Sequence, residues 1–199
     1  MAYIRIDLAQ MPQFFRGTEE VCNSFCENQQ QIDRAFNTIQ TTWRDKNAVI
    51  TCTQLGETAH CISKFYLSLN EAIDYLVRVC NNRAEYVDFG KLTPPQLGQF
   101  TVNLMEITKV EDSTINTNPD ALEEFKAALD KYIQSIVDNA DKLRRLYIKI
   151  GESWDDEQYE KFGDALSQFT NQMQVQVDIL DRISAFLKGK IEILRRGDI

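Results

Sequence analysis

The sequence predicts an all-α fold in which two tandem long antiparallel helical hairpins form a pseudo-two-fold four-helix bundle. Four long segments space their apolar residues as amphipathic helices do. The chain has two tryptophans, Trp43 and Trp154, and each lies between a shorter and a longer segment. A shift that superimposes these tryptophans also brings the flanking residues of the two halves into register.

In the first half, helices are expected from about residue 11 to 41 and from about 52 to 87. The short stretch 3–8 alternates like an extended strand, and Pro12 suits the first turn of a helix. The second segment has an apolar seam with alternating spacings of three and four, typical of long helices that lie nearly antiparallel. The seam consists of Leu55, Ala59, Ile62, Tyr66, Leu69, Ile73, Leu76 and Cys80.

Residues 89–118 differ in kind from the helical segments and are interpreted as a connector. They contain Gly90, Pro94, Pro95 and Gly98, followed by a β-prone run over 100–110. We expect one ordered piece here, either a short helix or an extended strand.

In the second half, helices are expected from about 120 to 150 and from about 155 to 195. A helix of roughly 30 residues extends about 45 Å, so helices of at least this length predict a rod-like bundle. The last helix opens with acidic residues and closes with basic ones, as the helix dipole favours, so neither group is interpreted as a cation, catalytic or ligand site. These residues are Asp155, Asp156, Glu157, Glu160, Arg195 and Arg196.

The register between the halves indicates an internal duplication. It divides the chain into a first hairpin (1–88), a connector (89–118) and a second hairpin (119–199). Identical residues coincide before and after the tryptophans, among them Phe14 with Phe125, Ser24 with Ser135, Arg34 with Arg145, Asp45 with Asp156, Leu55 with Leu166, and Leu69 with Leu180.

Each tryptophan is predicted to lie at the tip of its hairpin, where one large ring can pack on both helix ends. Asp45 and Asp156 follow two residues later and can cap the next helix. In the second copy, Ser153 together with Asp156 is an alternative capping arrangement. The tryptophan rings could also form an exposed aromatic notch for a partner. The candidate partner-binding positions are therefore Trp43, Asp45, Trp154 and Asp156.

The hairpin with a Trp-x-Asp turn resembles the W-x-G superfamily of early-secreted-antigen type, associated with bacterial type VII secretion. The resemblance covers roughly 1–87 and 115–196, including the opening Ile4-Arg5-Ile6-Asp7. Asp45 and Asp156 stand where the family has glycine, and no Tyr-x-x-x-Asp/Glu signal follows either second helix. The family's hairpins pair as antiparallel dimers, so the resemblance implies that this tandem chain supplies both halves and is a monomer or a weak homo-oligomer.

Composition limits the function classes. A net charge of −8 argues against nucleic-acid binding, since phosphates require a basic face. No apolar run is long enough for a membrane span, and no basic-then-apolar secretory signal opens the chain. The expected location is therefore the cytoplasm, or outside the cell by a route independent of such a signal. Five cysteines, all in the first half, do not form a disulfide framework and are expected to be reduced.

One constellation has metal-binding residue types: Cys22, Cys26, His60 and Cys61. A Cys₃His zinc site or a Cys26–Cys61 disulfide is conceivable if the first hairpin folds about Trp43. The favoured interpretation is cysteines packed as small hydrophobes and a surface histidine, with no metal and no cofactor. No catalytic or phosphate-binding motif is found, so no catalytic residue is assigned and the chain is not expected to be an enzyme.

We therefore expect a non-enzymatic helical interaction protein of a type VII-like secretion system: a secreted factor, a structural subunit or an effector escort. Its protein partners would be the secretion machinery or effector helices. The alternative is a cytoplasmic four-helix adaptor or phage/host-interaction protein unrelated to secretion. An enzyme or metal-binding bundle is the third and least favoured class.

Overall fold

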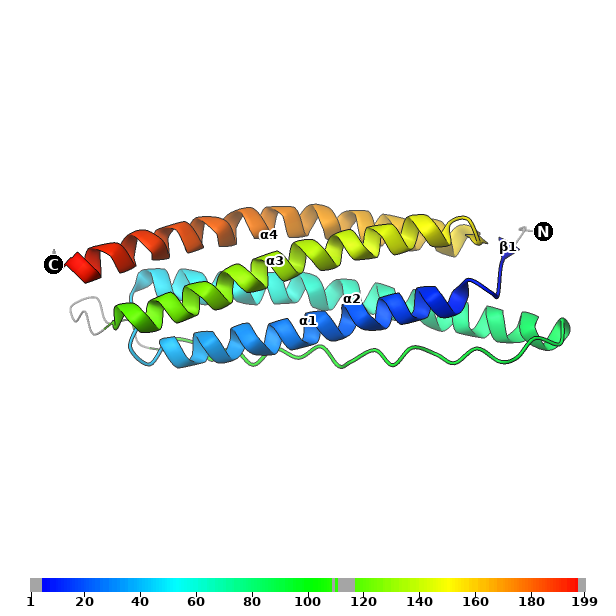
Figure 1. The fold of residues 1–199 in the computed structure, drawn as a ribbon, viewed down its shortest axis with the longest axis horizontal. Helices are drawn as coiled ribbons and strands as arrows, with labels where there is room; N and C mark the ends of the chain where they lie inside the picture. The colour runs from blue at the N-terminus through cyan, green and yellow to red at the C-terminus, as the bar shows by residue number, and fades with distance from the viewer. Residues whose placement is uncertain (1–4, 109, 111–116, 197–199) are drawn as a thin grey trace.

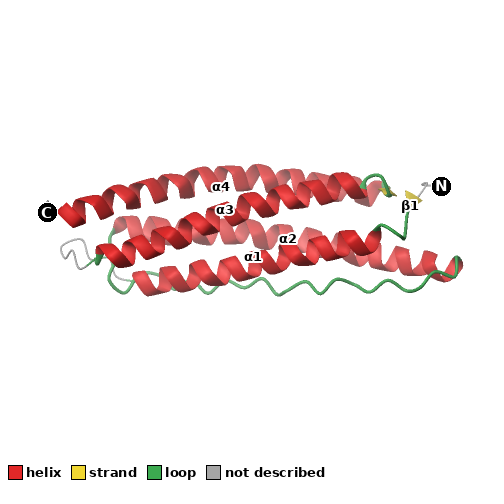
Figure 2. Ribbon diagram, in the orientation of Figure 1, coloured by secondary structure: helices red, strands yellow, loops and turns green. Residues whose placement is uncertain are grey.

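The structure, a computed structural model, describes residues 5–108, 110 and 117–196. Its four long helices run side by side in an elongated bundle (Figures 1 and 2), which confirms the predicted all-α fold. The elements in chain order are β1 (Arg5–Ile6), α1 (Met11–Ile39), α2 (Lys46–Tyr86), α3 (Pro119–Ile150), β2 (Trp154–Asp155) and α4 (Glu157–Arg196).

The helix boundaries follow the predicted repeat. The ends of α1 and α3, at Ile39 and Ile150, are separated by the same 111 residues as the two tryptophans. The starts of α2 and α4, at Lys46 and Glu157, have this separation too. Helix α2 begins earlier than the predicted start near Cys52, because Asp45 caps it at Lys46, ahead of the apolar seam that starts at Leu55.

The two hairpins run in opposite directions, so their tips lie at opposite ends of the bundle. At one end, Trp43 contacts Phe125 near the start of α3, with ring centroids 5.9 Å apart. At the other end, β1 pairs antiparallel with β2, placing Ile6 opposite Trp154. Around the bundle, α1 packs against α3, α3 against α4, and α4 against α2.

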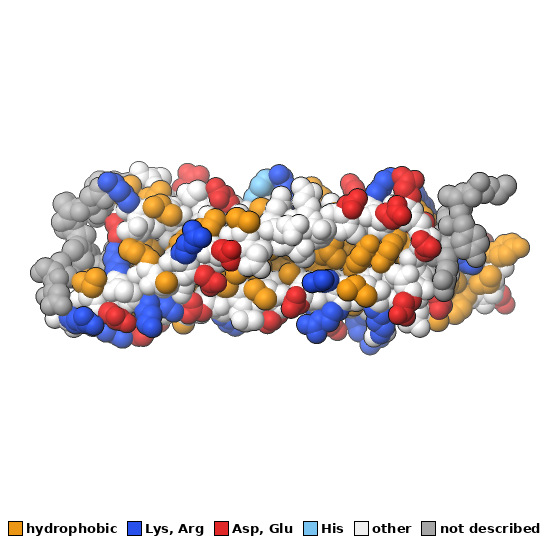
Figure 3. Space-filling model, turned by 90° about the horizontal axis from the view of Figure 1, so that it is seen from above, with side chains coloured by type: hydrophobic (Ala, Val, Ile, Leu, Met, Phe, Trp, Pro, Cys, Tyr) orange, Lys and Arg blue, Asp and Glu red, His pale blue; other side chains and the backbone are white. Residues whose placement is uncertain are grey.

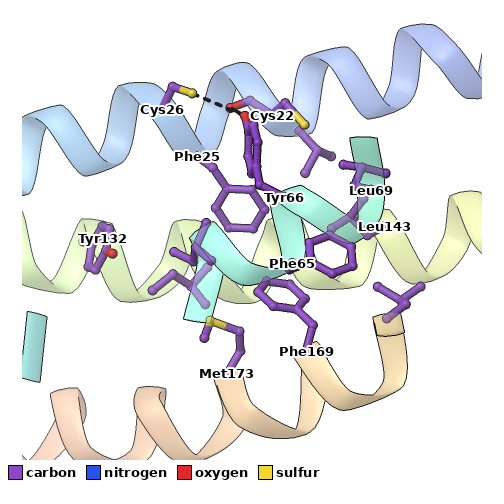
Figure 4. Packing of buried hydrophobic residues seen from close by; sticks show 14 of the residues in the cluster. Cys22, Phe25, Cys26, Phe65, Tyr66, Leu69, Tyr132, Leu143, Phe169 and Met173 are labelled. Carbon is purple, nitrogen blue, oxygen red and sulfur yellow. Dashed lines mark hydrogen bonds between the residues drawn. The ribbon is translucent and has the colours of Figure 1, made fainter. Parts of the chain in front are cut away.

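The two halves share one core, and aromatic rings from both meet in its middle (Figure 4). Phe65 of α2 stacks on Phe169 of α4 at 4.3 Å, and Phe25 of α1 meets Phe169 edge-on at 6.0 Å. Every member of the predicted α2 seam is buried. Burial of such rings is a main source of stability, so neither hairpin has a separate core of its own.

The connector lies along the first hairpin as an extended strap, defined here as residues 89–108 (Figure 1). Helices α1 and α2 have few direct contacts with each other. Side chains of the strap pack against the core instead, namely Leu92, Leu97, Phe100, Leu104 and Ile107. The strap contains neither the short helix nor the strand that were the two predicted alternatives. Its backbone is extended but does not pair with another strand.

No helix within the described residues is both long and apolar enough to cross a membrane.

Candidate functional site

The first tip is closed by residues of the second half. The Trp43 ring is fully buried and packs on Phe125. Lys190 of α4 places its Nζ 5.6 Å from the centre of the Trp43 ring and also forms an ion pair with Asp45. The cation therefore interacts with both the ring and the carboxylate of the Trp-x-Asp turn.

Asp45 caps α2 as predicted. Its Oδ1 accepts hydrogen bonds from the backbone amides of Asn47 at 2.9 Å and Ala48 at 3.0 Å. Its backbone, at φ −76° and ψ 178°, is open to any L-residue, so an aspartate can occupy the position where the W-x-G pattern has glycine. Burial tends to raise the pKa of Asp45, but hydrogen bonds from Lys190 and Ala48 and the Lys190 charge lower it overall.

The second tip is built in the same way but closed by different residues. Trp154 is fully buried, and its Nε1 donates to Asp156 Oδ1 at 2.9 Å. The same oxygen accepts from the amides of Gln158 and Tyr159, so Asp156 itself caps α4. From the first half, Tyr75 donates its hydroxyl to Asp156 Oδ2 at 2.7 Å. Burial, and then this bond, raise the pKa of Tyr75 to about 12.

Each tip is thus sealed by the opposite hairpin, Trp43 by α3 and α4 and Trp154 by α2 and β1. Neither ring has accessible surface in this structure, so an aromatic notch would form only if the bundle opened. The two halves are held together at the tips by the buried tryptophan rings and by the bonds of Asp45 with Lys190 and of Asp156 with Tyr75.

A buried polar chain that the sequence analysis missed links the second half to the strap. Tyr132 of α3 donates to Gln29 Oε1 at 2.7 Å, and Gln29 donates to Asp33 Oδ1 at 2.7 Å. Asp33 Oδ2 then accepts the backbone amide of Asn103 in the strap at 2.7 Å. Burial raises the pKa of Asp33 despite these hydrogen bonds. The signal was present in the sequence, because Gln29 interrupts the apolar spacing between Phe25 and Ile32.

The structure does not gather the candidate zinc residues into one site. The cysteine pair of α1 faces Tyr66, whose hydroxyl lies 3.3 Å from Cys26 Sγ and donates to the Cys22 carbonyl at 2.9 Å (Figure 4). His60 is exposed, and all five cysteines are free. Across the described part of the chain, no group of three or more His, Cys, Asp or Glu residues is placed to hold a metal ion. Burial raises the pKa of Cys22 to about 11, which keeps its thiol protonated.

Together, the helix order and the two sealed tips define a tandem helical-hairpin protein with a tryptophan at each turn. Residues 114–192 match the family model WXG100, described as proteins of 100 residues with WXG. The match covers the second hairpin, which is therefore similar to the W-x-G family of type VII secretion hairpins. Comparison with curated proteins and with solved structures gives no significant match.

Proposed function

We propose that the chain is a non-enzymatic interaction protein of a type VII-like secretion system, acting as a secreted factor, a structural subunit or an effector escort. The observation that carries the proposal is the WXG100 match of the second hairpin, which joins a first hairpin with the same helix boundaries and Trp-x-Asp turn.

Because the two halves share one core, a partner is expected to bind the outer surface of the bundle. Each half covers the apolar face of the other, so the chain needs no second hairpin protein to bury its core. Linking the halves makes their association intramolecular. A secretion partner therefore binds the outer surface of a completed bundle, where apolar side chains such as Val137, Ile148 and Phe186 are exposed.

An affinity-tagged full chain, expressed in the source bacterium and captured after cross-linking, tests the proposal by mass spectrometry. We expect enrichment of an FtsK-type ATPase or of a secreted effector from the same system. A tagged acidic helical bundle of similar size is the control. Enrichment solely of proteins unrelated to secretion would contradict the proposal and favour the cytoplasmic adaptor.

A further inference from the structure

Helices α1 and α2 have few direct contacts and are covered by the strap, whereas α3 and α4 pack directly on each other and leave an open groove beside their contact. The open groove has a volume of about 640 Å³ and lies midway along the second hairpin. The helices close over it at one end, where Tyr147 stacks on Tyr159 at 4.4 Å. Figure 3, viewed from the side of α4, shows apolar side chains between the charged ones on this face.

Residues that line the open groove are equivalent, by the repeat, to residues that contact the strap in the first hairpin. Shifted by 111 residues, the strap-contacting residues Cys26, Asp33, Asn37, Cys52 and Tyr66 become Val137, Arg144, Ile148, Gly163 and Val177. All five of the latter line the open groove. The strap contacts themselves include the Asn103 amide on Asp33, the Met105 amide on Asn37, and Phe100 against Tyr66 at 5.5 Å.

The chemistry of the two grooves differs at the centre. In the first groove, Asp33 is an acceptor and binds a backbone amide of the strap. In the second groove, the equivalent Arg144 is exposed and is a donor alone, so a carboxylate is the strongest acceptor that an occupant can offer it. Val137 and Ile148 are 39% and 61% exposed, so an occupant has apolar surface to cover. Asp141 also lines the groove, and its charge disfavours an acidic group of an occupant beside it.

We propose that the α3–α4 groove binds an extended segment of a partner protein, which lies across the positions equivalent to those that contact the strap in the first hairpin. The segment carries apolar side chains three or four residues apart, like Leu97, Phe100, Leu104 and Ile107, with an acidic residue facing Arg144. This proposal rests on the interaction role proposed above and specifies its surface.

The test uses the full-length chain and a fluorescein-labelled peptide with the sequence of residues 94–108, changed by Asn103→Asp to face Arg144 with a carboxylate. Fluorescence anisotropy is expected to show saturable binding. Val137→Glu, or Arg144→Glu, is expected to weaken it at least about tenfold, a loss of roughly 1.4 kcal/mol. Val175→Glu is the matched control, because Val175 is exposed on α4 outside the groove and its change is expected to leave binding intact.

Exchanging the charges of the peptide and of residue 144 distinguishes binding in the α3–α4 groove from binding in place of the chain's own strap. A second peptide with Asn103→Lys is expected to bind the unchanged chain poorly and to bind Arg144→Glu better. Absence of saturable binding, equal loss with Val175→Glu, or no recovery in the exchange would overturn the proposal. Because the measurement uses purified components, its failure leaves the secretion link to be judged by the cross-linking capture.

Discussion

Lys190 is the residue through which α4 holds the first tip, because it is paired with Asp45 and lies over Trp43. Both side chains of the ion pair are largely shielded, at 19% and 27% exposure. Removing one partner of such a pair leaves the other partly desolvated and uncompensated, which costs more than the loss of a surface pair. At the second tip, the Tyr75 hydroxyl donates to the equivalent carboxylate, Asp156.

Lys190→Met is expected to lower the free energy of unfolding by about 1–2 kcal/mol at neutral pH. The pKa of Asp45 is lowered in the folded state. Its ion pair therefore contributes fully above the ordinary aspartate pKa of about 4 and is lost as the pH falls through the lower, folded-state pKa. Urea unfolding of both proteins at pH 7 and pH 3 should show a stability difference that shrinks in acid.

Lys161→Met is the control for this measurement, because Lys161 pairs with Glu157 where the side chains are 59% and 77% exposed. Its effect on stability is expected to be much smaller. A stability difference for Lys190→Met that is the same at both pH values would show that the ion pair is not what holds the tip.

At the scale of elements, the strap takes the place of direct packing between α1 and α2. Asp33 and Asn37 bind it through side-chain oxygens, which accept the amides of Asn103 at 2.7 Å and Met105 at 2.9 Å. These bonds lie beside the buried chain that continues through Gln29 to Tyr132. The strap is thus fixed by the same network that joins α1 to α3.

The double change Asp33→Ala and Asn37→Ala is expected to release the strap while the helices remain. The hydrogen bond to the Asp33 carboxylate contributes roughly 1.5–3 kcal/mol and the one to the neutral Asn37 about 1 kcal/mol, so with both removed the amides of Asn103 and Met105 should exchange with solvent at least about tenfold faster. Hydrogen–deuterium exchange measures this. Arg144→Ala with Ile148→Ala, at the equivalent positions, should leave strap exchange unchanged. Unchanged exchange in the first variant would mean that the strap is held in another way.

The sequence predicts the helices better than the strap, for a physical reason. Periodic apolar residues predict the helices, and Trp43 and Trp154, each with a capping aspartate two residues later, predict the tips. The strap has no such period, since its backbone conformation is set by contacts with α1 and α2 rather than by local preference. Its place between them, and the few direct contacts between these helices, therefore follow only from tertiary structure.

At the scale of the whole molecule, the chain is organised like a dimer of hairpins contained in one polypeptide. The contacts between α1 and α3 and between α2 and α4 all cross from one half to the other. Both tips are also sealed across this boundary, by Lys190 at one end and Tyr75 at the other. Such an arrangement predicts that the halves stay together when the covalent link is cut, because their association buries one shared core.

The measurement that tests this most directly is light scattering on the chain before and after cleavage at a protease site placed within residues 111–116. The intact chain is expected to have the mass of one polypeptide, 23.0 kDa. After cleavage, the two fragments are expected to elute together with nearly that same mass. Fragments that separate, or an intact chain that forms an obligate dimer, would contradict the claim that the two hairpins complete one bundle.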